Sequence, residues 1–159
     1  RQKQIWENKW TGRTLTNGRN LAEGNLSAEE KASLILRYSS MPGTSRHHWG
    51  SDLDINSVEE AYFEEERGKI EYDWLCLNAQ KFGFFQPYTA KGTGRNSGYE
   101  EEKWHWSFAP VSVPFLDAYL TQIAYSDISG FEGSDTAATL NVIENYVCGI
   151  ASLRFSSPI

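Results

Sequence analysis

Residues 45–54 read Ser-Arg-His-His-Trp-Gly-Ser-Asp-Leu-Asp, and residues 102–106 read Glu-Lys-Trp-His-Trp. Apolar and polar side chains alternate at residues 52–55 and again at residues 104–108, which predicts two short strands. Gly50 stands where the backbone can turn sharply from a loop into the first strand. We expect the two strands to be neighbours in one small sheet, around which the rest of the chain folds.

Helical patterns surround these strands along the chain. Ser27, with Glu30 three residues later, is a capping-box pattern that predicts a helix from there to about Tyr38. Further helices are expected over residues 2–10, 58–66, 70–82, 115–125 and 136–150, with Gly68 as a break and a third strand at residues 84–85. Because helices and strands do not alternate as repeated βαβ units, the sequence predicts an α+β fold with a small antiparallel sheet and the helices packed to one side.

Length and charge narrow the classes of protein to consider. The chain has 159 residues, which fits a single domain over residues 1–159. Its net charge of −6 and its lack of a Lys/Arg cluster argue against nucleic acid or an anionic membrane surface as a partner. No apolar run is long enough to predict membrane insertion within this chain. The chain opens at Arg1 without a Met, so we expect a fragment that lacks an N-terminal segment.

The two cysteines carry little functional signal. Cys76 and Cys148 both lie in apolar helical surroundings, which predicts two small buried hydrophobic side chains. A disulfide between them is possible, but their spacing does not support one.

All three histidines of the chain fall in the two stretches quoted above, together with several acids. A catalytic zinc takes three protein ligands, leaves a position open and needs a base beside it. His47 can approach from a loop, Asp54 from the adjoining strand and His105 from the neighbouring strand. Glu102, three residues before His105, can place its carboxylate near the metal. The alternative is a solvated loop, since any one histidine alone is more often structural than a ligand.

The pattern Ser45-x-His47-x-x-Gly50-x-x-x-Asp54, followed by Glu102-x-x-His105, closely resembles the D-alanyl-D-alanine carboxypeptidase family. This is the VanY-like branch of a group that also holds D-Ala-D-Ala dipeptidases, lysostaphin-like enzymes and hedgehog-like domains. The resemblance implies a hedgehog/D-Ala-D-Ala-peptidase-like fold and covers nearly the whole chain. It also implies the site roles: Zn2+ bound by His47, Asp54 and His105, with Glu102 as the catalytic base.

The resemblance further implies a substrate and a location. The substrate would be a peptidoglycan stem peptide ending in D-Ala-D-Ala, trimmed by one residue in the bacterial periplasm or cell envelope. Ser45, from its place in the motif, and Trp104, which flanks a ligand, are the candidate substrate-binding residues. Two alternatives stay open: a peptidoglycan endopeptidase of the same fold, and a non-catalytic zinc-stabilised module that binds cell-wall peptides or a protein partner.

Two departures from the family pattern bear on activity. Asp52 stands where the family usually has a small residue, and it is expected either to orient a ligand histidine or to lie exposed on its strand. The family also has an Arg ahead of the first helix, and this chain is expected to begin after that point. Arg1 is not expected to replace it, and Arg46 occupies a variable position of the motif. A weakly active or inactive protein is therefore one of the expectations.

Several neighbours of the motif residues have alternative assignments. His48 is expected outside the ligand set, at the rim of the site or behind a ligand. Glu101 would replace Glu102 as base if the register were shifted by one residue, although the spacing to His105 favours Glu102. The loop at residues 86–99 is either a rim or lid of the site or an unstructured connection.

Overall fold

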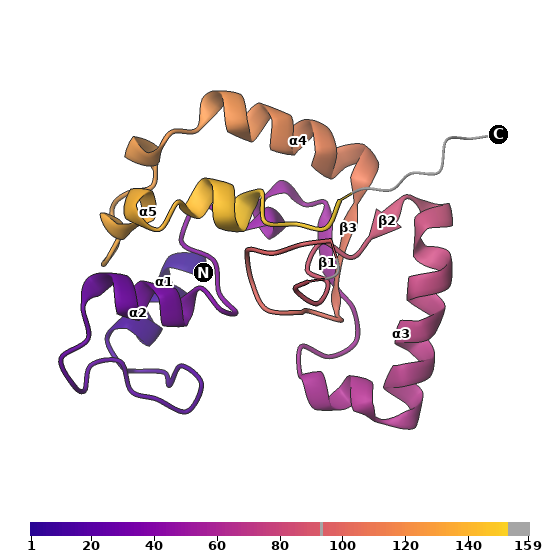
Figure 1. Cartoon of the computed structure of the whole chain (residues 1–159), viewed down its shortest axis with the longest axis horizontal. Coiled ribbons are helices and arrows are strands. Elements are labelled where there is room, and N and C mark those ends of the chain that lie inside the picture. Colours follow the sequence, from indigo (N-terminus) through magenta and orange to yellow (C-terminus); the bar gives the residue numbers. More distant parts are fainter. Residues whose placement is uncertain (93, 153–159) are drawn as a thin grey trace.

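The computed structural model describes residues 1–92 and 94–152 and confirms the α+β class (Figure 1). Its α-helices are α1 (Gln2–Trp10), α2 (Ala28–Ile35), α3 (Glu66–Asn78), α4 (Ala109–Gln122) and α5 (Thr136–Thr139). Its strands are β1 (Asp52–Asp54), β2 (Phe84–Phe85) and β3 (His105–Phe108). Short 3-10 turns cover Arg46–Trp49, Glu60–Glu64, Ala79–Phe82 and Tyr125–Asp127, and a π-helical turn covers Ile143–Val147.

The three strands form one antiparallel sheet in the order β1-β3-β2. In the β1–β3 pair Asp54 lies opposite His105, and Leu53 lies opposite Trp106. Because side chains alternate between the two faces of a strand, Asp54 and His105 share one face and Leu53 and Trp106 share the other. The sheet therefore has a polar face and an apolar face, and the polar one carries both motifs.

Helices lie on both sides of the sheet rather than on one (Figure 1). Helix α3 stands on one side, while α1, α2 and α5 lie on the opposite side. The apolar face of the sheet needs a cover, and Leu53 and Trp106 share a groove with Trp74 and Leu75 of α3. The expectation that all helices pack to one side is thus wrong, because α3 lies on one side of the sheet and α1, α2 and α5 lie on the other.

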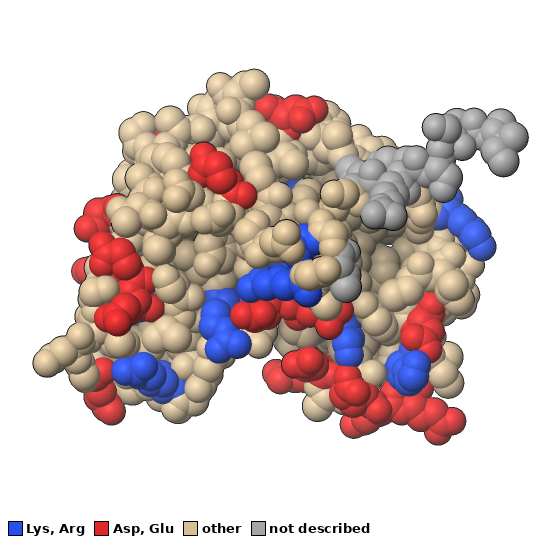
Figure 2. Space-filling view, in the orientation of Figure 1, with Lys and Arg blue, Asp and Glu red and all other residues tan. Residues whose placement is uncertain are grey.

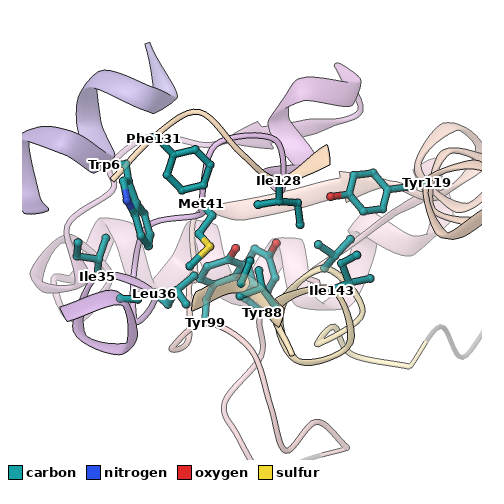
Figure 3. Close-up of a cluster of buried hydrophobic side chains, with 14 of the residues drawn as sticks. Trp6, Ile35, Leu36, Met41, Tyr88, Tyr99, Tyr119, Ile128, Phe131 and Ile143 are labelled. Carbon is teal, nitrogen blue, oxygen red and sulfur yellow. The ribbon is translucent and has the colours of Figure 1, made fainter. Parts of the chain in front are cut away.

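The main hydrophobic core lies on the side of α1, α2 and α5 (Figure 3). Trp6 of α1 is completely buried there, edge-on against the ring of Phe131. Its indole Nε1 donates to the backbone oxygen of Glu132, 2.8 Å away. The core therefore joins the beginning of the chain to its C-terminal part.

The helix at Ser27 begins as expected, but the predictions for residues 58–66 and for Gly68 were wrong. The Ser27–Glu30 capping box is present, although α2 ends at Ile35. Residues 58–66 form only a short 3-10 turn, and Gly68 lies inside α3 rather than breaking it. A Cβ on Gly68 would lie 2.0 Å from the backbone oxygen of Tyr62. The glycine is there for close packing, which a sequence pattern alone does not distinguish from a break.

Two more helix boundaries differ from the sequence expectation. Helix α4 begins at Ala109 rather than at residue 115, because Pro110 fits the first turn of a helix, where no N–H bond is lost. The expected helix over residues 136–150 is interrupted at Asn141, whose φ is 49°. A positive φ is incompatible with a continuous right-handed helix, and the chain resumes as the π-helical turn.

The cysteines are both free: Cys76 is exposed on α3 and Cys148 is half-buried. The prediction of two buried side chains is therefore wrong for Cys76, because its face of α3 is open to solvent. None of the helices in the described ranges combines the length and the apolarity needed to cross a bilayer.

Trp6 provides a test of the core. Changing Trp6 to Ala should lower the free energy of unfolding by about 3–5 kcal/mol, because it empties a fully buried indole site. Leu77→Ala is the matched control, since that side chain is 77% exposed and its loss should change stability by less than about 0.5 kcal/mol. Urea unfolding followed by circular dichroism measures both. Equal effects of the two changes would contradict the position of the core.

Candidate functional site

The polar face of the sheet brings the two motifs together. Asp54 ends β1 and His105 begins β3, directly opposite each other in the ladder. His47 sits in the 3-10 turn Arg46–Trp49, which closes at Gly50 with a φ of 68°. That left-handed conformation favours glycine and turns the chain into β1, as the sequence predicts. The loop, the turn and the two strands thus aim three side chains at one place.

These three side chains can hold a metal ion. Asp54 Oδ1 lies 3.4 Å from His47 Nε2 and 3.6 Å from His105 Nδ1. The three ligand atoms all lie within 4.8 Å of one another. A tetrahedral zinc with bonds of roughly 2.1 Å holds its ligand atoms about 3.4 Å apart. The spacing in the structure therefore matches a small tetrahedral metal with little rearrangement.

The donor chemistry also fits. Two imidazole nitrogens and one carboxylate oxygen are the ligand types of catalytic zinc sites. His105 is 3% exposed, whereas the side chains of His47 and Asp54 are 40% and 39% exposed. An ion bound here would be coordinated by buried His105 on one side and would remain accessible to solvent on the other. This is the arrangement that leaves a coordination position open.

Glu102 lies beside this cluster. Its buried carboxylate has Oε2 3.1 Å from His105 Nδ1. The chain turns tightly here, since the backbone N–H of His105 donates to the oxygen of Glu102 at 3.2 Å. The expected closeness of Glu102 to the cluster is thus present, while Glu101 is not among the residues that line the adjoining cleft.

The acidic neighbours of His105 and the burial of the cluster set the protonation of its side chains. Burial alone would lower the pKa of His105, but its hydrogen bonds to Asp52 and Glu102 outweigh burial and raise the pKa to about 9. Burial also opposes ionisation of Asp54, and the hydrogen bond from His47 more than offsets this and lowers the pKa of that carboxyl. Without a metal, His105 therefore holds its proton strongly, and a divalent cation at Nδ1 would have to displace a proton from this ring.

The cluster opens into a cleft of about 750 Å³. Ser45 and Trp104 both line this cleft, so each is placed where a substrate could contact it. The facing wall comes from α1, through Gln2, Ile5 and Lys9. Figure 2 shows the surface hollowed between the part of the chain that carries α1 and α2 and the part that carries α3, with acidic side chains beside the hollow.

The sequence did not predict that α1 forms a wall of the cleft. Gln2, Ile5 and Lys9 follow the three- and four-residue spacing of one helix face, and this spacing is the signal that could have found them. The sequence predicted only that residues 2–10 form a helix, without a role at the site. Helix α1 carries core residues on one face and cleft residues on another, so its amino-acid composition alone does not reveal which residues line the cleft.

The other aromatic and histidine candidates lie elsewhere. His48 is exposed and lies outside the cluster, as expected. Trp106 is on the opposite face of the sheet, and Trp49 packs against Tyr119 with ring centroids 5.9 Å apart. Trp104 is thus the tryptophan of the two motifs that faces the cleft.

The loop at residues 86–99 is held together by hydrogen bonds from one buried arginine side chain. Buried Arg95 donates to the backbone oxygens of Ser97, at 2.6 Å, and of Tyr99, at 2.7 Å, and it also contacts the oxygen of Thr89. Tyr88 of the same loop packs edge-on against His105 with ring centroids 4.7 Å apart. The loop therefore forms part of the site's wall and is not an unstructured connection; residue 93 lies outside the described residues.

Comparisons with known proteins agree with the motifs. A curated D-alanyl-D-alanine carboxypeptidase of Enterococcus faecalis is 33% identical over 92 residues, which is 58% of this chain and 32% of that protein. The match thus spans about a third of the relative's length. No solved structure matches the chain significantly. The profile of the VanY family, described as D-alanyl-D-alanine carboxypeptidase, matches residues 1–111. With more than half of its length matched, the chain belongs to the VanY family of D-alanyl-D-alanine carboxypeptidases.

Proposed function

We propose that this protein is a Zn2+-dependent D-alanyl-D-alanine carboxypeptidase that trims peptidoglycan stem peptides by one residue. The observation that carries the proposal is the convergence of His47, Asp54 and His105 on one point, with Glu102 beside them. The family supports the peptidase class, and the printed name of the Enterococcus relative supports this substrate. Such a substrate would place the protein in the periplasm or cell envelope of a bacterium.

The residues have separate tasks in this reaction. Bound Zn2+ supplies a Lewis acid that polarises the scissile carbonyl and lowers the pKa of water. The Glu102 carboxylate accepts the proton of the attacking water and passes it to the departing amine. His47, Asp54 and His105 fix the position of the ion relative to that carboxylate. Ser45 and Trp104 contact the peptide from the wall of the cleft.

The first prediction concerns Glu102. Changing Glu102 to Gln should lower kcat for release of D-Ala from a D-Ala-D-Ala-terminated peptide by roughly 10²–10⁴-fold, because the general base is lost. The variant should still bind Zn2+, since the three proposed ligands are intact. Glu101→Gln is the matched control and should leave kcat unchanged, because Glu101 does not line the cleft.

Three outcomes of that comparison are informative. Turnover that is unaffected in Glu102→Gln excludes Glu102 as the base. Loss of turnover in Glu101→Gln alone would move the role by one residue. If the wild type binds both Zn2+ and the peptide without releasing D-Ala, the non-catalytic binding module is the correct function.

The metal is tested by its effect on stability. Zn2+ at 100 times its dissociation constant should stabilise the wild type by about 2.7 kcal/mol, because it binds only the folded state. Asp54→Ala should lose most of this stabilisation, since one of three ligands is gone. Asp73→Ala is the control, because Asp73 lies exposed on α3 in an ion pair with Lys69. Thermal unfolding with and without Zn2+ gives the comparison, and an equal shift in wild type and Asp54→Ala would argue against this centre.

The position of the cleaved peptide bond distinguishes a carboxypeptidase from an endopeptidase. A carboxypeptidase recognises the terminal carboxylate, so capping that carboxylate as an amide should lower kcat/KM by at least about 10-fold, the effect of 1.4 kcal/mol of lost binding. Mass spectrometry of the products from the free and the amidated peptide gives both the rate and the cut bond. Equal cleavage of the two peptides at an internal bond would favour the endopeptidase.

A further inference from the structure

Asp52 lies directly behind the candidate metal centre, and its carboxylate is fully buried. Its Oδ2 lies 2.9 Å from His105 Nε2 and accepts from Arg46 Nε at 3.0 Å. Its Oδ1 accepts from the hydroxyls of Ser51 and Ser107 at 2.7 Å and 2.8 Å. Four donors thus surround one carboxylate, which leaves it no freedom to rotate away from His105.

The same residue also holds the other histidine. The backbone oxygen of Asp52 lies 3.2 Å from His47 Nδ1. When an imidazole donates one ring N–H to an acceptor, its other nitrogen is left as the ligand. For His47 that nitrogen is Nε2, and for His105 it is Nδ1. These are the two atoms that face Asp54.

We infer that Asp52 is the positioning residue of the metal centre, fixing the orientation and the ring tautomer of both ligand histidines, one through its backbone oxygen and the other through its carboxylate. This inference rests on the proposed function, because it assigns Asp52 a task toward the metal of that site. Asp52 does not itself touch the ion, since its carboxylate lies on the far side of the His105 ring from Asp54.

Arg46 and Ser107 hold Asp52 in place. The buried Arg46 guanidinium lies against the ring of Trp49, 4.7 Å from its centroid, and its Nη2 donates to Ser107 Oγ at 2.9 Å. Ser107 lies opposite Asp52 in the β1–β3 ladder. The strand register that places Asp54 opposite His105 therefore also places Asp52 against its own support.

The test compares Zn2+ affinities by competition with a chromophoric chelator. Asp52→Asn keeps an oxygen that can accept from His105 Nε2 and should weaken Zn2+ binding by less than about 10-fold. Asp52→Ala removes that acceptor and should weaken it by about 10–100-fold, the usual effect of losing a partner of a ligand histidine. Ser51→Ala is the control, because it removes one hydrogen bond to the same carboxylate and leaves the contacts of that carboxylate with His105 and Arg46. Its Zn2+ affinity should stay within a few-fold of the wild type.

A second measurement uses the unchanged protein, so it does not depend on the variants folding. Nitrogen-15 NMR of the Zn2+-loaded wild type should show the ring proton on Nδ1 of His47 and on Nε2 of His105. The opposite tautomer of either ring would overturn the inference, as would an Asp52→Ala variant that folds and binds Zn2+ as tightly as the wild type. The proposed function fails separately: a wild type that binds no Zn2+ overturns both, whereas a wild type that binds Zn2+ and releases no D-Ala leaves the role of Asp52 standing.

Discussion

The site depends on the register of one short pair of strands. β1 and β3 pair so that Asp54 lies opposite His105 and Asp52 lies opposite Ser107. A slip of one residue would turn the side chains of one strand to the opposite face of the sheet and separate the two acids from His105. The alternation of faces favours this register, because it buries Trp106 on the apolar face beside α3 while His105 stays on the face of the acids. The hydrophobic pattern of the sheet thereby sets the geometry of its polar face.

The candidate site could be predicted from the sequence because its parts are local. His47 and Asp54 are separated by one turn and one strand, and Glu102 and His105 by one tight turn, so their spacing limits where each side chain can point. The site also required one long-range contact, the pairing of the two strands. The alternation of apolar and polar residues in both strands predicted that pairing. The α+β class followed from the same two strands. The placement of the helices on the two sides of the sheet could not be predicted from these strands, since helices can pack against either face of a three-stranded sheet.

The parts that sequence missed depend on contacts between distant segments. Gly68 lies inside α3 because the backbone of Tyr62 leaves no room for a Cβ, and no local pattern reports that distance. Arg46 was placed at a variable position of the motif, although the structure buries it completely. An arginine in a loop is ordinarily solvated. Its burial follows only once Asp52, Ser107 and Trp49 are known to surround it.

That buried pair is better explained by geometry than by stability. Removing both charges of Arg46 and Asp52 from water costs several kcal/mol for each ion, which their mutual attraction repays only with complete hydrogen bonding. Asp52 is fully satisfied by four donors, but Arg46 Nη1 has no hydrogen-bond partner among the described residues. An apolar pair of similar volume would avoid this desolvation, yet it could not hold His105 Nε2 and would take away a partner of the buried Ser107 hydroxyl. The arrangement is consistent with a support that fixes one imidazole behind the candidate metal centre, at a cost in desolvation to the folded state.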